Sequence, residues 1–504
     1  MSTARAWTVM HVGADSELAS IEAVAASNSP NHPTAWATSL PETRDRVRAA
    51  IPNSRLAWPH RPVDLESAPV PLAALGPGCD LAIACAVLAL DRAVPPYRLR
   101  TTVLVGELGL DGSIRPRRGV LPALTAAADA GLRYAIVPTT QLTEARMAPG
   151  ITAYGAGSLA EAAAWLRAPL PTPPDDMRRP DDPAGAPTPT STLDLADVAG
   201  SSHVRQTLEI AAAGGHHLLL TGPPGAGTTA LARCLPGILP PLTQGQALRV
   251  AELRSLAGVA VDRVDPTAPF VAPHHSTSLA AFVGGSPTSR SSPGQISLAH
   301  GGVLFLDVTE FSPRHLDALT AAVEEKEIRI ANQDRVLRYP ARVQLVLAAT
   351  PCPCGPQPGT DCGCTPAARR RHRARLATPL LDRVDLRISI SSPPAQPTVH
   401  AAPPEPSAAV RARVTAARDR AAHRWHDLGA TTNAAIPDAA LHRIVHALPV
   451  SVTRRLHTAL ETGALSRRGA HGCLRVAWTL ADLAGADRPD ADHITTALAL
   501  RQGR

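Results

Sequence analysis

The chain has 504 residues, about three times the length of a typical single domain, so we expect two to four domains. Hydrophobic residues make up 44%, enough for several cores, and the formal net charge is +7. No apolar run approaches the roughly 18 residues that a membrane helix needs. The start of the chain (MSTARAWTVM) lacks the regions of a signal peptide. We therefore expect a soluble, cytoplasmic protein without membrane contacts.

The basic residues are almost all arginine, because Lys326 is the single lysine among 50 basic residues. Together with 50 prolines and 35 glycines, this matches a GC-rich coding bias, so the positive charge partly reflects codon usage. Arginine still binds phosphate well, and the composition therefore allows a polyanionic partner without requiring one.

The first part of the chain, residues 1–168, alternates short apolar runs with turn signals. The segment 103–112 (VLVGELGLDG) predicts a strand followed by a turn at its Asp-Gly pair. An alanine-rich stretch over 121–130 predicts a helix, and residues 134–137 predict another strand. We expect an α+β or α/β domain here.

Two proline-rich segments divide the rest of the chain. Eight of the 21 residues in 169–189 are proline, which predicts an extended linker over 169–192, and a second linker is predicted over 392–406. Between them, residues 193–391 alternate strand and helix patterns, whereas 407–504 predict helices alone. These helices are expected at 408–424, 438–447, 452–460, 475–484 and 491–501.

A glycine-rich turn lies between a predicted strand and a predicted helix at residues 218–233 (LLLTGPPGAGTTALAR). Its glycines stand where a phosphate-binding P-loop has glycines, and Thr229 stands where a hydroxyl reaches magnesium. Consecutive backbone N–H groups and a helix N-terminus can wrap a polyphosphate in such a turn. The order strand, loop, helix favours a nucleotide site over a purely structural turn. The candidate binding residues are Gly222, Pro223, Pro224, Gly225, Ala226, Gly227, Thr228 and Thr229.

The loop departs from the P-loop pattern at Thr228, which occupies the place of the lysine that contacts the β- and γ-phosphates. Threonine offers a hydroxyl without a charge. We therefore expect the backbone to hold a nucleotide weakly, and we do not expect fast hydrolysis.

A second half of this site is predicted at residues 302–307 (GVLFLD), an apolar strand that ends in Asp307. A carboxylate in this position, about 85 residues after the loop, has the form of a Walker B aspartate, which holds Mg²⁺. Alone, such an aspartate is commonly a cap or turn residue. In combination with the loop it predicts binding of ATP and Mg²⁺.

Several longer strings make the resemblance to a known family specific. They are APHHSTS at 272–278, VGG at 283–285, PGQISLAHGGVLFLD at 293–307, YPAR at 339–342, PCPCG at 351–355, PLLDRVD at 379–385, GELGLDG at 106–112 and RVAWTLADL at 475–483. With them, nearly the whole chain resembles the ComM/YifB family of Mg-chelatase-like AAA+ ATPases.

The resemblance implies a Lon-protease-like, S5-type N-domain over 1–168, a P-loop AAA+ core with a parallel sheet, and a small all-helical lid. It also implies a homo-oligomeric, hexameric ring, and some members of the family act as DNA branch-migration helicases in natural transformation. By position, the loop would bind ATP or ADP, and Asp307 and Thr229 would hold magnesium. Arg383 would be the arginine finger offered to a neighbouring subunit, and Arg468 a lid arginine at the γ-phosphate.

Two further family positions differ besides Thr228. Val308 replaces the Walker B glutamate, in a string that is one residue short and brings Glu310 close without placing it correctly. Thr350 replaces the sensor asparagine. Losing the charge clamp, the water-activating base and the sensor together removes most of the means of cleaving the γ-phosphate. We therefore expect binding with reduced or absent hydrolysis.

Four cysteines form a C-x-C…C-x-C cluster: Cys352, Cys354, Cys362 and Cys364. Four thiolates within 13 residues suit a tetrahedral structural zinc, although four reduced thiols in a loop are the alternative. The remaining cysteines stand in apolar contexts typical of core residues.

The Lon-like resemblance raises the question of proteolysis. The segment 76–84 (GPGCDLAIA) lacks the serine nucleophile of that family, and the following helix lacks its lysine. Cys79 as a nucleophile would need an activating base that the sequence does not identify. A structural or docking role is expected instead.

The densest charge run is 369–375 (RRRHRAR), which predicts either a solvated face or a contact with a neighbouring subunit or with phosphate. Aromatic residues are only 3% of the chain, so any DNA contact is expected at backbone phosphates and should be salt-sensitive.

Our leading hypothesis is a ring-forming, ATP-binding AAA+ protein that acts on DNA, with a degenerate site. A competent branch-migration motor and a nucleotide-gated assembly or regulatory subunit remain as alternatives. An Mg-chelatase subunit proper is less favoured, because that component lacks the fused N-domain and the cysteine cluster.

Overall fold

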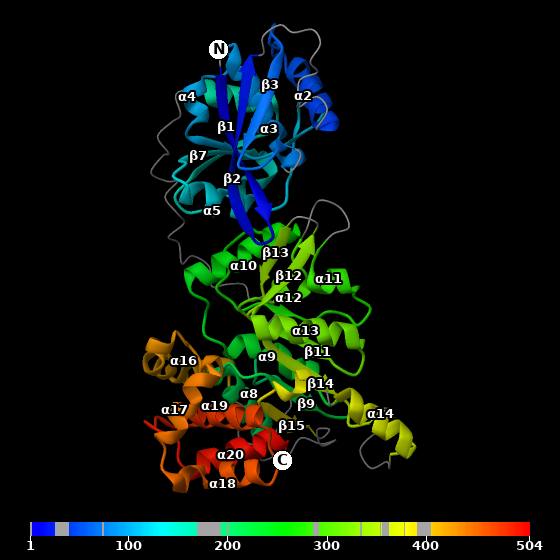
Figure 1. Ribbon diagram of the computed structural model, residues 1–504, viewed down its shortest axis with the longest axis vertical. Helices are drawn as coiled ribbons and strands as arrows, with labels where there is room; N and C mark the ends of the chain where they lie inside the picture. Colours follow the sequence, from blue (N-terminus) through cyan, green and yellow to red (C-terminus); the bar gives the residue numbers. More distant parts are fainter. Residues whose placement is uncertain are drawn as a thin grey trace.

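The computed structural model describes residues 3–25, 40–72, 75–168, 193–198, 201–285, 292–332, 335–352, 354, 362–376, 379–390 and 405–503. Of the two predicted linkers, 169–192 lies wholly outside these residues, and of 392–406 only the last two residues are described. The molecule is elongated, with the N-terminal part at one end and the C-terminal helices at the other (Figure 1). Within the described ranges, no helix is both long and apolar enough to cross a membrane.

The N-terminal part is a six-stranded mixed sheet in the order β3-β2-β1-β4-β7-β8. Its strands are β1 (Thr3–Val12), β2 (Asp15–Ala25), β3 (Val63–Ala68), β4 (Thr102–Leu104), β7 (Tyr134–Pro138) and β8 (Thr152–Ala156). Its helices are α2 (Pro41–Asn53), α3 (Asp80–Leu90), α4 (Pro96–Leu99), α5 (Val120–Asp129), α6 (Leu142–Ala145) and α7 (Leu159–Arg167). Helix α3 is apolar on all sides after its first residue and is completely buried, as such a composition requires.

The sequence-based expectations for this part are confirmed where the structure tests them. The predicted helix over 121–130 is α5, and the predicted strand at 134–137 is β7. The predicted strand and turn correspond to β4 and to a short hairpin of β5 (Glu107–Leu108) with β6 (Ile114–Arg115).

The middle part contains a fully parallel five-stranded sheet in the order β10-β11-β14-β9-β15. Its strands are β9 (Leu218–Thr221), β10 (Phe270–Val271), β11 (Val303–Asp307), β14 (Gln344–Ala349) and β15 (Leu386–Ser389). Alternate residues face opposite hydrophobic clusters: Leu218 and Leu220 belong to one and Leu219 to the other. The sheet is therefore covered on both faces, which explains its nearly continuous apolar strands.

Helices and a hairpin surround this sheet. The helices are α8 (Ser202–Gly214), α9 (Thr228–Ile238), α10 (Gln244–Ala257), α11 (Leu279–Val283), α12 (Gln295–Leu298), α13 (Pro313–Glu325), α14 (Pro366–Leu376) and α15 (Pro379–Asp382), and the hairpin joins β12 (Glu327–Asn332) to β13 (Arg335–Pro340). Helices α8 and α9 cover one face, and α13 contributes to the cluster on the other. Helix α14 extends away from the body of the molecule (Figure 1).

The C-terminal part is helical, as predicted. Its helices are α16 (Ser407–Arg424), α17 (Asp438–His446), α18 (Val450–Glu461), α19 (Arg467–Ala484) and α20 (Ala491–Gln502). Helix α19 begins well before the predicted 475, because the Ser466 hydroxyl accepts a hydrogen bond from the Gly469 N–H (3.0 Å) and caps the helix there. These helices share one hydrophobic cluster with the α8–α9 face of the sheet, so they pack directly against it.

The N-terminal part is joined to the middle part at the β1–β2 turn and at α10. The Ala14 N–H donates to the Arg338 carbonyl (2.8 Å), and the Gly119 N–H donates to the Ser255 carbonyl (3.0 Å). Gly13 has φ +68° and lies so close to β13 that a Cβ would approach the Arg338 carbonyl oxygen to 2.5 Å. This turn therefore requires glycine.

Candidate nucleotide-binding site

The glycine-rich loop connects strand β9, which lies between β14 and β15 in the sheet, to helix α9. The Gly222 N–H donates to the Ala349 carbonyl at the end of β14 (3.1 Å), and a Cβ on Gly222 would meet the Ile390 carbonyl oxygen at 3.0 Å. Gly225 and Gly227 have φ values of +81° and +83°, which only glycine adopts readily. Close backbone contacts therefore favour glycine at position 222, and positive φ values favour glycine at positions 225 and 227.

The N-terminus of α9 is open to an anion. Gly227 precedes the helix and provides no side-chain cap, so the first N–H groups have no partner within the helix. Such groups, together with the helix dipole, favour phosphate. Thr228 is the first residue of α9 and is half-buried, while Thr229 is exposed. This geometry is that of a phosphate cradle without a cationic side chain in the lysine position.

Asp307 lies at the same edge of the sheet as the loop. It pairs with Ala348 of β14, and Ala348 pairs with Leu220 of β9, so Asp307 and Leu220 flank β14 at one level. Two strand spacings place their backbones about 10 Å apart. One carboxylate oxygen of Asp307 accepts hydrogen bonds from the N–H (3.0 Å) and hydroxyl (2.6 Å) of Thr309. Asp307 therefore also stabilises the turn that follows β11, which is the structural role that the sequence offered as the alternative to metal binding.

The Walker B glutamate position is filled by a core residue. Val308 is only 5% exposed and belongs to the hydrophobic cluster on the α13 face of the sheet. Glu310 is exposed, and its carboxylate lies 3.2 Å from the His275 ring. Val308 has no ionisable group, and the carboxylate of Glu310 faces the His275 ring.

Thr350, at the sensor position, directly follows β14. Its carbonyl oxygen lies 2.7 Å from Nε2 of His372, a buried histidine on α14. The preceding residue, Ala349, accepts the hydrogen bond from Gly222. The adjacent carbonyl groups of Ala349 and Thr350 therefore contact the loop and α14, respectively.

The two predicted arginines converge on one carboxylate. Arg383 forms an ion pair with Glu324 of α13, and its side chain is 12% exposed. Arg468, at the start of α19, lies 3.9 Å from Glu324 and 3.9 Å from Asp382. Burial lowers the pKa of Arg383, and the neighbouring charge of Arg468 lowers it further. Both guanidinium groups are thus paired within the chain at the junction of sheet and C-terminal helices.

The four cysteines of the cluster come together. Their sulfur atoms all lie within 4.8 Å of one another, which is compatible with the spacing of about 3.8 Å between thiolates around a tetrahedral zinc. The N–H of Cys364 and the thiol of Cys352 lower the pKa of Cys362 to about 7. The cluster could therefore hold a metal ion.

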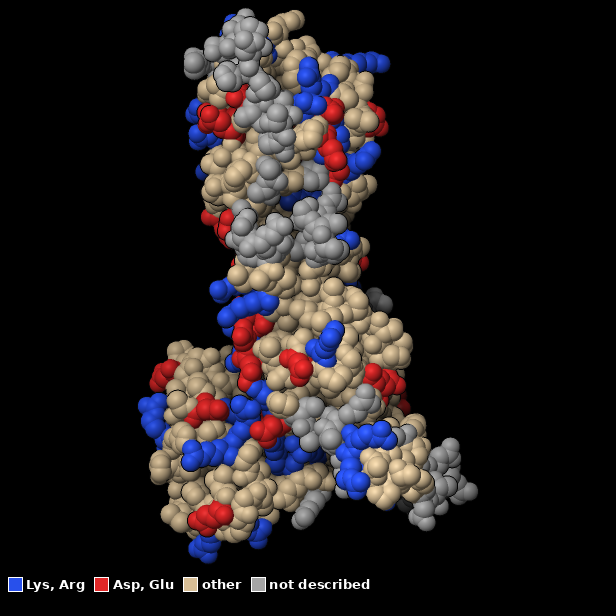
Figure 2. Space-filling model, turned by 45° about the vertical axis from the view of Figure 1, so that its right-hand side comes forward, with Lys and Arg blue, Asp and Glu red and all other residues tan. Residues whose placement is uncertain are grey.

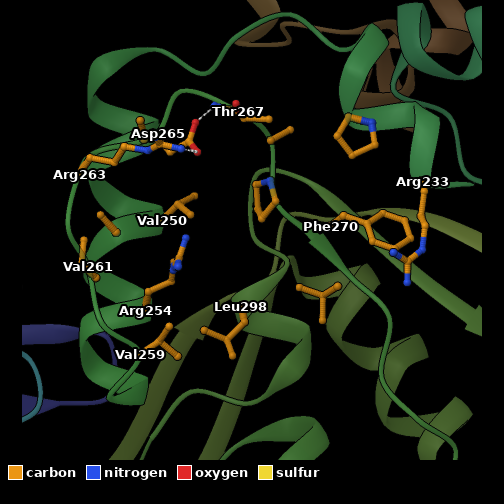
Figure 3. A pocket seen from close by; sticks show the side chains of 16 residues that line it. Arg233, Val250, Arg254, Val259, Val261, Arg263, Asp265, Thr267, Phe270 and Leu298 are labelled. Carbon is orange, nitrogen blue, oxygen red and sulfur yellow. Dashed lines mark hydrogen bonds and ion pairs between the residues drawn. The ribbon is translucent and has the colours of Figure 1, made fainter. Parts of the chain in front are cut away.

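One cavity of the described residues is separate from the loop. It has a volume of about 460 Å³ and is lined by α9, α10, β10 and the segment between α10 and β10 (Figure 3). Arg233, Arg254 and Arg263 stand on its walls, and Arg263 is 3.5 Å from Asp265. Residues 222–229 do not line it, so this cavity is distinct from the predicted nucleotide loop.

The N-terminal part offers no activated nucleophile at Cys79. This side chain is 1% exposed, and its thiol donates to the Gly76 carbonyl (2.9 Å). Burial, followed by the charge of Asp80, raises the pKa of Cys79 to about 12. The thiolate needed for covalent catalysis is therefore disfavoured.

Three residues that organise this region are not part of any recognised sequence motif. Glu324 sits in an acidic run with the appearance of a solvated helix end, and His372 is hidden within the arginine run. His216 is fully buried and contacts Asp385 (2.9 Å) and the Thr479 hydroxyl (2.8 Å), which ties the sheet to α19. The sequence signal for His216 is its position two residues before the apolar strand β9.

Comparison with known proteins agrees with this architecture. The model of the family "Magnesium chelatase, subunit ChlI" matches residues 194–398, and its C-terminal counterpart matches 404–501. A third model, "Subunit ChlI of Mg-chelatase", matches 34–141. The α/β fold and these matches define a magnesium-chelatase-like protein of the AAA+ type.

Relatives that match over nearly the whole chain identify the family more closely. A Mycobacterium tuberculosis protein described as uncharacterised is 44% identical over 100% of this chain and 99% of its own length. YifB of Salmonella typhimurium is 39% identical over 92% of this chain and 90% of its own, and the competence protein ComM of Haemophilus influenzae is 34% identical over 99% and 98%. The chain belongs to the ComM/YifB family of magnesium-chelatase-like proteins.

Proposed function

We propose that this chain is an ATP-binding AAA+ protein that assembles into a ring and acts on DNA, with a site that hydrolyses ATP slowly or not at all. The observation that carries the proposal is the uncapped N-terminus of α9 inside the glycine loop, with a neutral Thr228 where a lysine would stand. The cradle would hold the phosphates of ATP or ADP through backbone N–H groups.

Magnesium would be held by the Thr229 hydroxyl and the Asp307 carboxylate. Asp307 has one oxygen committed to Thr309, which leaves the other for a magnesium-bound water. The ion would neutralise phosphate charge that no lysine neutralises here.

Slow turnover is supported by the side chains around the cradle. Val308 is buried, Glu310 is paired with His275, and Thr228 carries no charge. Transition-state charge on the γ-phosphate would therefore lack most of the groups that stabilise it.

Ring formation and action on DNA are proposed from the family, whose Haemophilus relative is named for competence. In such a ring Arg383 would leave Glu324 to reach a neighbour's nucleotide, and Arg468 would stay at the C-terminal helices as a lid arginine. We further propose that the N-terminal part is a Lon-like docking domain without protease activity, since Cys79 is buried and protonated.

For the cysteine cluster we propose structural zinc. Four sulfur ligands without an open position are typical of a structural site. Cys352 follows β14 and Cys364 precedes α14, so the ion would fix the start of that helix against the central sheet.

The test compares the wild-type protein with Thr228→Lys and with Thr140→Lys, which adds the same charge at an exposed N-terminal threonine. Calorimetric titration with ATP and Mg²⁺ should give weak binding for the wild type. Thr228→Lys should bind about 10-fold more tightly, because a charge-assisted contact is worth about 1.5 kcal/mol. Thr140→Lys should match the wild type.

The second measurement is the rate of phosphate release from ATP, with and without branched DNA. Little release by the wild type supports the degenerate site. DNA-stimulated turnover would instead identify a competent motor, and no heat with either ATP or ADP would reject the nucleotide site altogether.

A further inference from the structure

Helix α14 contains a dense run of arginines. Five arginines fall within 369–375, and no acidic residue occurs between Asp361 and Asp382. Arg369, Arg370 and Arg371 are exposed, and no described carboxylate forms an ion pair with them. Figure 2 shows basic side chains gathered on the projecting lobe at the lower right of the molecule.

Polar contacts anchor the described part of the helix. Among its described side chains, only His372 is buried, and its ring contacts the Thr350 carbonyl (2.7 Å). Ahead of the helix, the Thr365 hydroxyl accepts from the Ala368 N–H (3.2 Å), and Cys364 belongs to the sulfur cluster. Anchored in this way, the helix leaves Arg369, Arg370 and Arg371 exposed.

We propose that α14 is a nucleic-acid-binding helix that contacts the phosphodiester backbone through Arg369, Arg370 and Arg371. This inference rests on the proposed action on DNA and assigns it to one element. Arginine forks match phosphate oxygens in a bidentate manner. Residues 362–376 contain no Phe, Trp or Tyr, and His372 is buried, so we expect contacts to phosphates and binding that is independent of sequence.

A second copy of this chain fits the helix less well than a polynucleotide. A nucleic acid offers a continuous row of negative charges, which complements a segment with five arginines in seven residues and no acidic residue.

The anchor also places α14 next to the nucleotide cradle. His372 contacts the carbonyl of Thr350, and the neighbouring Ala349 carbonyl accepts from Gly222 of the loop. Two hydrogen bonds on adjacent peptide units thus link the basic helix to the loop.

The test uses fluorescence anisotropy of labelled duplex DNA of mixed sequence over a salt series. The variant is the triple change Arg369→Gln, Arg370→Gln and Arg371→Gln. The matched control is Arg61→Gln, Arg100→Gln and Arg133→Gln, which removes the same charge from exposed arginines of the N-terminal part. The slope of log affinity against log salt should fall by about 2 to 3 in the variant, close to 0.9 for each lost phosphate contact. The control should keep the wild-type slope.

The outcomes separate the two proposals. If the wild type binds DNA and the α14 variant keeps its slope and affinity, the assignment to α14 is wrong and the action on DNA stands. If the wild type does not bind DNA, the DNA part of the proposed function fails. If the variant retains DNA binding but loses self-association in sedimentation, α14 is a subunit interface and the inference is overturned. Circular dichroism of all proteins checks that they are folded.

Discussion

Arg383 is ion-paired with Glu324 of its own chain, at the junction where the parallel sheet meets the C-terminal helices. A residue expected to reach a neighbouring subunit is therefore restrained within the monomer. Arg468 shares the same carboxylate at 3.9 Å. Release from Glu324 becomes a condition for any contact between Arg383 and a second subunit.

Changing Glu324→Gln should favour assembly in the presence of ATP, because it frees the Arg383 guanidinium. Loss of an ion pair worth about 1 kcal/mol should raise the association constant about fivefold. Analytical ultracentrifugation with ATP and Mg²⁺ measures this. Glu325→Gln is the matched control, since Glu325 is similarly exposed and pairs with Arg329 (3.2 Å). Equal association by the two variants would contradict a role of Arg383 between subunits.

Changing Asp307→Asn should abolish the effect of Mg²⁺ on ATP binding, because the amide removes the charge that attracts the ion. Thr309→Ala removes the hydrogen bonds of the hydroxyl to Asp307 and keeps the carboxylate charge. It should therefore retain the Mg²⁺ effect while losing about 1 kcal/mol of stability. Titrations with and without Mg²⁺, together with urea denaturation, distinguish the two variants. An unchanged Mg²⁺ effect in Asp307→Asn would remove Asp307 from the metal site.

Stability should fall as the pH decreases from about 6.5 to about 4. Burial lowers the pKa of His217 to about 4, so the unfolded chain takes up a proton there in a pH range where the folded chain does not. This stabilisation is complete above pH 6.5 and is lost as the pH falls, with a total of up to about 3 kcal/mol. His300 contributes in the same direction, because burial lowers its pKa to about 4.

Urea midpoints measured across this pH range test the prediction. His217→Gln should flatten the pH dependence, since a glutamine oxygen can accept the Leu345 N–H bond that Nδ1 of His217 accepts (3.1 Å). His426→Gln changes an exposed histidine and should leave the dependence as in the wild type. An identical slope in all three proteins would show that His217 does not titrate in this way.

Removal of the metal from the cysteine cluster should loosen α14 and leave the sheets intact. Elemental analysis should find about one zinc per chain in the wild type and in Cys85→Ala, and much less in Cys362→Ser. Limited proteolysis should then cut the Cys362→Ser protein faster near α14. A zinc content below half an equivalent in the wild type would show that the four thiols are simply reduced.

Local patterns predicted much of the fold. The apolar strand before Gly222 and the strand ending in Asp307 lie in the sheet as expected, and the C-terminal helices other than α19 lie close to their predicted bounds. Such features depend on side-chain periodicity and on turn chemistry, both of which act between residues that are near in sequence.

The sequence by itself determined the glycine cradle, the missing charge at Thr228 and the grouping of the four cysteines, because each is contained within a few consecutive residues. Only the tertiary structure decided that Val308 is a core residue, that Arg383 and Arg468 meet at Glu324, and that His216 joins Asp385 to Thr479. Those contacts link residues far apart along the chain. Their geometry is set by the order of strands and the packing of helices, and neither is encoded in any single segment.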